Sequence, residues 1–385
     1  MKFIHAADLH LDTPFSSINS FYGELQEKLQ KSTYTAARRV FQTAIDQKVD
    51  FVILAGDTFD DTDRSLEAQT FLKDQFELLN KSGIKVYLVY GNHDYYRNDY
   101  SVINFPDNVT VFDSDVNTAT LEADGMKIGI TGFSYYQQHV SDDMISRYPS
   151  RGDFDYQIGI LHAGVMDNNY APFKVTDLLA KGYDYWALGH IHKREILNKM
   201  PYVIYPGDTQ GRNQNDLGEK GFYLLTVKDK ITTAQFVPSS VYVWNKETIN
   251  AEEDDTLDSL LLKISNVLVN KNTMTTLTIN NAQKLSDDVV KAIDRGEILH
   301  HFRNNKSAIL YKIYPKYNRK NNLSTIDQKY WDDSKTNIFD LDDIKDLDSR
   351  LYNNEIIRKH INQPDFLKHM QELVENTVNK KYNGE

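Results

Sequence analysis

The stretch HAADLHLDTPF, residues 5–15, extends the apolar run MKFIH and places Asp8 and His10 where a buried strand would give way to a loop. Side chains at positions i and i+2 of an extended segment point to the same side, so these two can converge on one point. A metal ion is one ligand that such a pair would bind. The alternative is an aspartate that caps a turn beside a surface histidine, and the rest of the chain decides between the two.

Strand-like and helix-like segments alternate along the first part of the chain. The apolar, strand-like runs are KFIHAA (2–7), DFVILAGD (50–57), KVYLVYGNHD (85–94), YQIGILHAG (156–164) and DYWALGHIH (184–192). This alternation predicts an α/β fold of layered sheets and helices. Ligand sites in such folds gather at the C-terminal ends of the strands.

Metal-capable side chains follow each of these runs. After D-x-H come the motifs G-D, G-N-H-D, a single His and G-H-x-H, whose residues are Asp57, Asn92, His93, Asp94, His162, His190 and His192. Each one alone has an ordinary explanation, such as a helix cap, a turn residue or a half-buried histidine. Independent accidents are not expected to produce this ordered series, so we interpret it as a metal site.

The residue types fit phosphoryl transfer assisted by two metal ions. Two divalent ions about 3.5–4 Å apart clamp the attacking and leaving oxygens, and they need a bridging carboxylate with separate ligands for each ion. Asp57 is the natural bridge. Neutral imidazoles and an amide oxygen limit the negative charge, so that a phosphodiester is not repelled.

Composition bounds the class of protein. The chain has 385 residues, 40% hydrophobic and 26% charged, which is enough for two or three globular domains. It has no cysteine, which excludes disulfides and thiolate sites. We find no apolar run long enough for a membrane span and no signal peptide, and therefore expect a cytoplasmic protein. The net charge of −11 argues against a protein that coats nucleic acid by charge alone, but not against an enzyme that acts on phosphates.

The ordered motifs resemble those of the calcineurin-like metallophosphoesterases. The fuller forms HAADLHLD, LAGDTFD, GNHD and ALGHIHKRE are similar to those of SbcD-type DNA repair nucleases, while HLDTPF and QGRN look most like the bacterial YhaO-type branch. YPGDTQGRNQNDLGEKGF (205–222) is similar to a segment that closes the catalytic domain of that family. The resemblance covers about residues 1–230 and implies a sandwich of two β-sheets flanked by helices, with the nuclease domain over residues 1–240.

The resemblance also implies two ligand sets that share one carboxylate. One metal would be held by Asp8, His10, Asp57 and His192, and the other by Asp57, Asn92, His162 and His190. His93 would protonate the leaving oxygen or steady the scissile phosphate, and Asp94 would orient its imidazole. We expect Mn²⁺, with Mg²⁺, Fe²⁺ and Zn²⁺ as alternatives.

Two residues depart from the family pattern. Asp60 stands where archaeal and eukaryotic members carry a histidine, so a second catalytic imidazole is not supplied there. Asp208 stands where the family usually has a serine, which places an extra carboxylate near the phosphate path. Three arginines, Arg97, Arg151 and Arg212, lie in segments that mix Arg, Tyr and Asn, and are candidate DNA contacts; ordinary surface loops are the alternative.

The sequence pattern of the chain changes after about residue 240. A strand–helix–strand pattern over residues 255–316 predicts a small separate α+β domain, followed by a polar linker over 317–345. By its place in the chain this domain resembles the small capping domain of that family. Residues 346–385 contain two amphipathic helix-like pieces that either dock a partner or pack on their own domain. The resemblance implies DNA and an SMC-like ATPase subunit of the SbcC type as partners, the latter docked by the C-terminal helices; a homodimer is a further option.

The leading hypothesis is a two-metal-ion DNA phosphodiesterase that acts in DNA repair, as an exonuclease and optionally as a single-strand endonuclease. One alternative is a phosphodiesterase for a small substrate, such as a cyclic nucleotide or a nucleotide ester. The long C-terminal extension argues against it. The other is a metal-site scaffold that binds partners without turnover, and the intact His93 with a complete ligand set argues against that.

Overall fold

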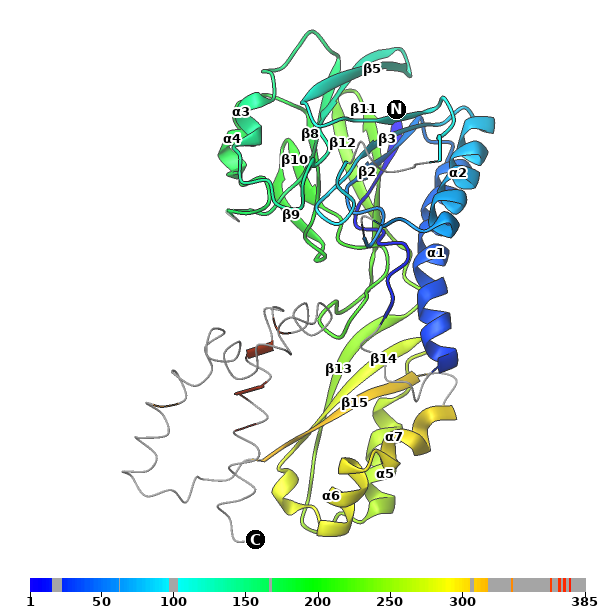
Figure 1. The fold of residues 1–385 in the computed structure, drawn as a ribbon, viewed down its shortest axis with the longest axis vertical. Helices are drawn as coiled ribbons and strands as arrows, with labels where there is room; N and C mark the ends of the chain where they lie inside the picture. Colours follow the sequence, from blue (N-terminus) through cyan, green and yellow to red (C-terminus); the bar gives the residue numbers. More distant parts are fainter. Residues whose placement is uncertain are drawn as a thin grey trace. The chain divides into compact units, whose positions relative to one another are not determined.

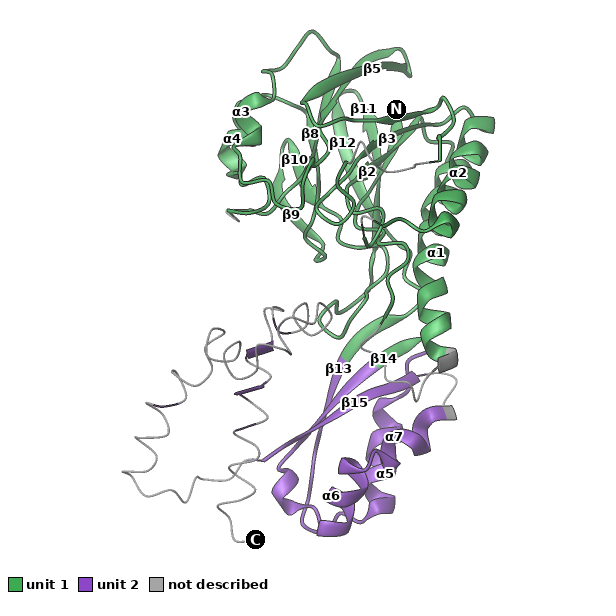
Figure 2. Cartoon of the chain, in the orientation of Figure 1, with its two compact units in different colours: residues 1–245, 272–274 green, residues 246–271, 275–385 purple. Residues whose placement is uncertain are grey.

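The structure, a computed structural model, describes residues 1–15, 23–61, 63–96, 103–165, 168–304 and 308–317, with the isolated positions 334, 361, 366, 367, 370, 371 and 374. The chain divides into two compact units. Unit 1 comprises residues 1–245 and 272–274, and unit 2 comprises residues 246–271 and 275–385 (Figure 2).

The first sheet of unit 1 has the strand order β12-β11-β1-β2-β3-β4. Figure 1 labels four of its strands, β2, β3, β11 and β12. Its strands are β1 (Lys2–Ala6), β2 (Phe51–Ala55), β3 (Lys85–Val89), β4 (Val109–Val111), β11 (Gly221–Lys228) and β12 (Ile231–Pro238). Strands β1 to β4 run parallel, whereas β11 and β12 join as an antiparallel hairpin beside β1.

The second sheet has the strand order β5-β6-β7-β8-β10-β9. Its strands are β5 (Asn117–Ala123), β6 (Met126–Gly132), β7 (Tyr156–His162), β8 (Tyr185–Gly189), β9 (Glu195–Lys199) and β10 (Tyr202–Tyr205). Its central strands, β6, β7, β8 and β10, are parallel, and the edge strands β5 and β9 are antiparallel to their neighbours.

The alternation of side chains in the central strands builds the layers. In β2, Phe51 and Ile53 pack into the core between the two sheets, while Val52 and Leu54 pack on the opposite face against helices α1 (Gly23–Asp46) and α2 (Leu66–Lys81). A strand buried on both faces reads as a continuous apolar run, which is what FVILA shows.

The outer face of the second sheet is covered in the same way. Helices α3 (Met144–Arg147) and α4 (Val175–Ala180) contribute Met144, Ile145 and Leu178 to a core that includes Trp186 and Leu188 of β8. The order helix, sheet, sheet, helix confirms the predicted α/β sandwich.

Unit 2 has a three-stranded sheet of order β13-β14-β15. Its elements are β13 (Val243–Asn250), α5 (Leu257–Val267), β14 (Thr273–Asn280), η2 (Ala282–Lys284), α6 (Asp287–Asp294), α7 (Glu297–His301), η3 (Phe302–Asn304) and β15 (Ala308–Lys316). Unit 2 begins at Lys246, and the polar strand β13 contributes to its sheet. The expected linker (317–345) and C-terminal segment (346–385) lie almost entirely outside the described residues.

Among the described residues, no helix combines the length and the apolar character that crossing a membrane requires.

Candidate metal centre

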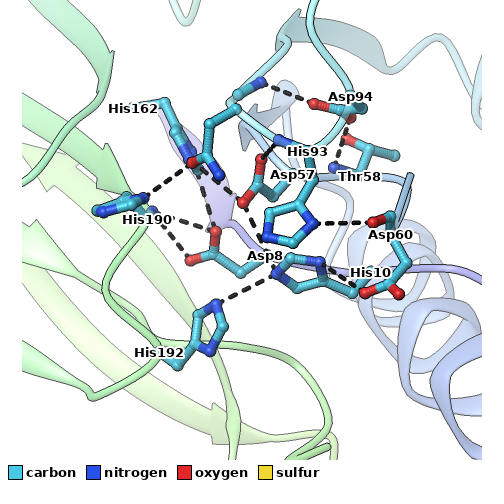
Figure 3. Close-up of polar contacts among 12 residues, drawn as sticks. Asp8, His10, Asp57, Thr58, Asp60, His93, Asp94, His162, His190 and His192 are labelled. Atoms are coloured by element: carbon cyan, nitrogen blue, oxygen red, sulfur yellow. Dashed lines mark hydrogen bonds and ion pairs between the residues drawn. The ribbon is translucent and has the colours of Figure 1, made fainter. Parts of the chain in front are cut away.

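The predicted site residues meet at one edge of the sandwich because they follow the C-terminal ends of parallel strands. Strands β1, β2 and β3 of the first sheet deliver the D-x-H, G-D and G-N-H-D motifs, and strands β7 and β8 of the second deliver the single His and G-H-x-H. Figure 3 shows these side chains pointing toward one another from both sheets.

The backbone of the site is strained. Asp8, His10, Asp57 and His190 all have positive φ values, of 52°, 43°, 47° and 98°. Each such residue costs on the order of 1–3 kcal/mol and persists only where its surroundings fix it. Backbone hydrogen bonds do so here: Asp8 N–H donates to the Gly56 carbonyl at 3.0 Å, and His10 N–H donates to the Asp57 carbonyl at 3.0 Å.

Asp8, His10 and His192 form a first cluster, whose potential ligand atoms lie within 4.8 Å of one another. His10 Nε2 and His192 Nε2 face each other at 3.2 Å (Figure 3). Two imidazole nitrogens this close need either a shared proton or a common cation. The Asp8 carboxylate is held in place by the His190 N–H, which lies 3.1 and 3.2 Å from its two oxygens.

Asp57, His162 and His190 form a second cluster of the same kind. The Asn92 Oδ1 atom lies 3.0 Å from His162 Nε2 and 3.0 Å from His190 Nδ1. His162 Nδ1 lies 2.9 Å from the Ala55 carbonyl, which can only accept a hydrogen bond, so the proton sits on Nδ1 and Nε2 faces the cluster.

The Asp57 carboxylate lies between the two clusters. Its Oδ2 atom is 3.4 Å from His162 Nε2 in the second cluster and 3.8 Å from His10 Nε2 in the first. Its Oδ1 atom accepts the His93 backbone N–H at 3.0 Å. One carboxylate oxygen is thus left to face both clusters.

Burial and mutual charge shift the pKa values of these groups strongly. Burial alone would raise the pKa of Asp57, but the imidazoles of His162 and His93 outweigh it and hold that pKa well below the usual value. Burial would lower the pKa of His162, but the Asp57 carboxylate raises it to about 9. Burial raises the pKa of Asp8 to about 6, against the lowering effect of His162, and lowers that of His190 to about 3.

Space at the second cluster depends on two glycines. A Cβ atom on Gly91 would lie 2.3 Å from Asp57 Oδ1 and 2.6 Å from His162 Nε2. A Cβ on Gly56, whose φ is +93°, would lie 2.2 Å from His162 Nδ1. Any side chain at these positions would displace the imidazole, which explains the glycine in each of the two motifs.

His93 lies beside the first cluster, with its ring centroid 4.9 Å from that of His10. Its Nδ1 atom lies 2.8 Å from the Asp60 backbone carbonyl, and so carries the proton that this bond requires. The Asp94 carboxylate, expected to orient the imidazole, instead accepts backbone N–H groups from Gly91 at 2.7 Å and from Thr58 at 2.8 Å. Asp94 therefore ties the loop that follows β3 to the loop that follows β2, because unpaired N–H groups in buried turns need an acceptor.

The two departures from the family pattern have different surroundings. The Asp60 carboxylate lies 3.3 Å from His10 Nδ1 and accepts from the Thr13 hydroxyl at 3.0 Å. Asp208 is fully buried and forms an ion pair with Lys220 at 2.8 Å, and the same Lys220 ammonium donates to the His192 carbonyl at 2.7 Å. The expected extra carboxylate therefore lies near the first cluster, within 4.8 Å of a ring nitrogen of His192, but it is buried and paired with Lys220.

The three candidate DNA-contacting arginines differ in position. Arg97 lies outside the described residues. Arg151 pairs with Asp184 and donates to the Gly182 carbonyl, so it lies at the N-terminal ends of β7 and β8. Because the cluster residues follow the opposite ends of those strands, the structure does not bring Arg151 to the site. Arg212 reaches the first cluster.

The sequence analysis missed two residues that contact members of the site, Arg64 and Asp216. Arg64 is buried, lies over the Tyr90 ring at 4.0 Å and donates to the Asp94 carbonyl at 2.6 Å. Asp216 lies 3.7 Å from His192 Nδ1. Neither lies in one of the strand-end motifs, and only the folded chain brings them near the clusters.

The donor set fits divalent cations. Both clusters offer imidazole nitrogens and carboxylate oxygens, with an amide oxygen in the second, and this mixture suits Mn²⁺, Fe²⁺ or Zn²⁺ better than the all-oxygen shell that Mg²⁺ prefers.

Comparison with known proteins agrees with the motifs. A family model described as calcineurin-like phosphoesterase matches residues 1–194. The chain is 39% identical over 267 residues to a Bacillus subtilis protein named "Uncharacterized metallophosphoesterase YhaO", covering 68% of this chain and 65% of that protein. It is 28% identical over 242 residues to the "DNA double-strand break repair protein Mre11" of Methanocaldococcus jannaschii, covering 58% of this chain and 62% of that protein. The protein of that name from Archaeoglobus fulgidus is 25% identical over 300 residues, with 70% and 65% covered.

These alignments thus span slightly less than two thirds of the relatives' own length.

We predict that Mn²⁺ binding releases a proton near neutral pH. The pKa of His162 is raised to about 9 by Asp57, so its imidazole is protonated in the metal-free protein, whereas a metal ligand must be neutral. The affinity should therefore increase by up to about tenfold per pH unit as the pH rises to about 9, and then level off. Calorimetric titration in buffers of different ionisation enthalpy measures the released proton directly.

The matched control for this prediction is His139→Gln, which alters an exposed histidine and should keep the pH dependence. His162→Gln should remove it. An affinity that stays constant from neutral pH to about pH 9 in the unaltered protein would contradict the charge state assigned to His162.

Proposed function

The chain belongs to the calcineurin-like phosphoesterase family, and on that basis we propose that it is a two-metal-ion phosphodiesterase that cleaves DNA, as an exonuclease and on single strands also as an endonuclease. One metal would be held by Asp8, His10, Asp57 and His192, and the other by Asp57, Asn92, His162 and His190. Mn²⁺ is the ion we favour at both positions.

The observation that carries this proposal is the position of Asp57 Oδ2, which faces imidazole nitrogens of both clusters at 3.4 and 3.8 Å. A single-metal site needs no carboxylate between two histidine sets. A pair of divalent ions sharing one carboxylate would supply charge stabilisation to the attacking and leaving oxygens of a phosphoryl displacement.

His93 is the residue we propose as general acid. The Asp60 carbonyl fixes one proton on Nδ1, so Nε2 is the ring nitrogen left for the substrate. In its imidazolium form the ring would donate the Nε2 proton to the leaving oxygen, which leaves the neutral ring protonated on Nδ1, or would hold a phosphate oxygen through Nε2–H. Its backbone N–H is tied to Asp57 Oδ1, which couples the position of the acid to that of the bridging carboxylate. Asp94 acts on His93 only indirectly, by fixing the loop on which it lies.

DNA as substrate is supported by the relatives named for double-strand break repair and by Arg212 beside the first cluster. The net charge of −11 means that binding would depend on local cations rather than on the whole surface. A small phosphodiester is the alternative substrate, and the assay below compares the two.

We further propose that the protein works in the cytoplasm with an SMC-like ATPase of the SbcC type, docked by residues 346–385, and that a homodimer is one form of the assembly. Support comes from the family resemblance and from the two amphipathic pieces in that segment, since such helices bind apolar grooves of partner proteins.

Asp57→Asn should abolish turnover, because an amide cannot supply the charge that two cations share. The assay uses Mn²⁺ with labelled single- and double-stranded DNA beside bis-p-nitrophenyl phosphate, and EDTA should silence it. Asp177→Asn, an exposed change on α4, is the matched control and should retain full activity. Wild-type rates in the Asp57→Asn protein would refute the shared-carboxylate assignment, and cleavage of the small diester alone would favour the alternative substrate.

His93→Ala should leave the metal content unchanged and lower the rate of the chemical step by about 10²–10⁴-fold, the usual contribution of a positioned acid or base. Metal content is measured by inductively coupled plasma mass spectrometry and the rate under single-turnover conditions. If the variant loses its metal together with its activity, His93 is a ligand and not the acid.

Deleting the chain from about residue 350 onward should leave hydrolysis of the small diester unchanged, because every proposed ligand lies before residue 193, but should abolish binding to the ATPase. Size-exclusion co-elution of the full-length and shortened chains with an SMC-like ATPase of the SbcC type measures the binding. Equal co-elution of both chains, or loss of diester hydrolysis by the shortened one, would show that the segment is an ordinary packed part of its own unit.

A further inference from the structure

Arg212 is held beside the first cluster by the loop between β10 and β11. The Asp216 carboxylate accepts the backbone N–H of Arg212 at 2.9 Å and that of Asn213 at 3.3 Å. The Trp244 indole N–H donates to the neighbouring Gly211 carbonyl at 2.9 Å. The loop backbone is therefore fixed on both sides of Arg212, and its side chain enters the site from a defined point.

The guanidinium of Arg212 lies between a carboxylate and a candidate metal ligand. Its Nη1 donates to Asp60 Oδ1 at 2.5 Å, and its Nη2 lies 3.3 Å from His192 Nε2. The side chains of Arg212 and Asp60 are 13% and 17% exposed, so the pair is mostly removed from water yet still open to a ligand. Within the described part of the chain, the buried Nε of Arg212 has no hydrogen-bond partner, so the donor capacity of the group is not exhausted.

A purely structural role does not account for this position. A fixed positive charge 3.3 Å from a ring nitrogen that would coordinate a cation repels that cation, and the repulsion is only partly screened because the guanidinium is mostly buried. The Asp60 carboxylate offsets part of this repulsion. An anion bound next to both the guanidinium and the metal cluster would offset the rest, and the scissile phosphate is the anion that the reaction brings there.

We propose that Arg212, oriented by Asp60, binds a non-bridging oxygen of the scissile phosphate and selects phosphodiesters over phosphomonoesters. Arg212 contacts the substrate, and Asp60 is a positioning residue. Selection follows from charge, because a diester carries one negative charge whereas a monoester carries up to two. The second negative charge of the monoester is repelled by the Asp60 carboxylate, which weakens its binding. This inference rests on the proposed phosphodiesterase function and names the group that recognises its substrate.

The test compares Arg212→Gln and Arg212→Lys with Arg151→Gln. Arg151 is a matched control because it also pairs with an aspartate, Asp184, but at the opposite ends of the strands. Both Arg212 variants should raise KM for bis-p-nitrophenyl phosphate at least about tenfold. Gln loses the charge-assisted hydrogen bond, and Lys binds a phosphate oxygen more weakly than the bidentate Arg does. Mn²⁺ affinity, measured by calorimetry, should stay equal or increase, because the positive charge of the guanidinium is removed in Arg212→Gln and displaced in Arg212→Lys.

A second readout needs no metal. Binding of a short fluorescein-labelled oligothymidylate to the EDTA-treated protein is followed by anisotropy over a range of salt concentrations. Arg212→Gln should lower the slope of log K against log salt by roughly 0.7, the value for one phosphate contact on a single strand, whereas Arg151→Gln should not change it. A structural role for Arg212 would leave this slope unchanged.

Asp60→Asn tests the selectivity. At saturating Mn²⁺ this variant should lower the ratio of bis-p-nitrophenyl phosphate to p-nitrophenyl phosphate hydrolysis, because the amide no longer repels the dianion. An unchanged ratio overturns the role given to Asp60.

Wild-type KM and salt slope in both folded Arg212 variants overturn the substrate contact, as does a loss of Mn²⁺ affinity that parallels the loss of activity. Absence of Mn²⁺-dependent diester hydrolysis in the unaltered protein refutes the proposed function instead, and the metal-free binding still reports on Arg212.

Discussion

The rest of the site depends on the contacts that the Asp57 carboxylate makes with residues of both sheets. One of its oxygens accepts the His93 backbone N–H, and the other faces imidazole nitrogens from both sheets. The two sheets are separate in hydrogen bonding, so nothing in their ladders determines how the end of β7 meets the end of β2. The shared apolar core brings the sheets together, and the polar groups at its edge then meet at distances that bonding to a common cation would satisfy.

This arrangement is maintained against strain. Positive φ values at Asp8, His10, Asp57 and His190 are unfavourable for residues with side chains, and they are tolerated because the loops carrying them are bonded to one another. The buried carboxylates around the clusters are costly in the same sense. Lys220 offsets Asp208 and Arg212 offsets Asp60, so these two carboxylates near the centre each have a cation within ion-pair distance.

The Asp60–Arg212 pair places a carboxylate bonded to a guanidinium where the family pattern has an imidazole. An imidazole can donate a proton, whereas a carboxylate paired with a guanidinium cannot, and it offers a fixed positive charge with directional donors instead. The site of this chain would therefore rely on His93 alone for proton transfer and on Arg212 for phosphate recognition.

The sequence by itself determined the layered α/β class and the order of the metal-capable residues, because both are local properties, while the two-sheet sandwich was implied by the family resemblance. Alternating apolar runs define the strands, and parallel strands place their C-terminal ends, with D-x-H, G-D, G-N-H-D, His and G-H-x-H, at one edge. Only the tertiary structure decided which groups the side chains near the metal-capable residues bond to. Asp94 follows His93 directly, yet the turn aims its carboxylate at backbone N–H groups near Thr58, and the carbonyl of Asp60 holds the imidazole. Arg212 and Arg151 read alike in the sequence, but one lies at the C-terminal and the other at the N-terminal ends of the strands. Such differences arise from contacts between segments far apart in the chain, which no local pattern encodes.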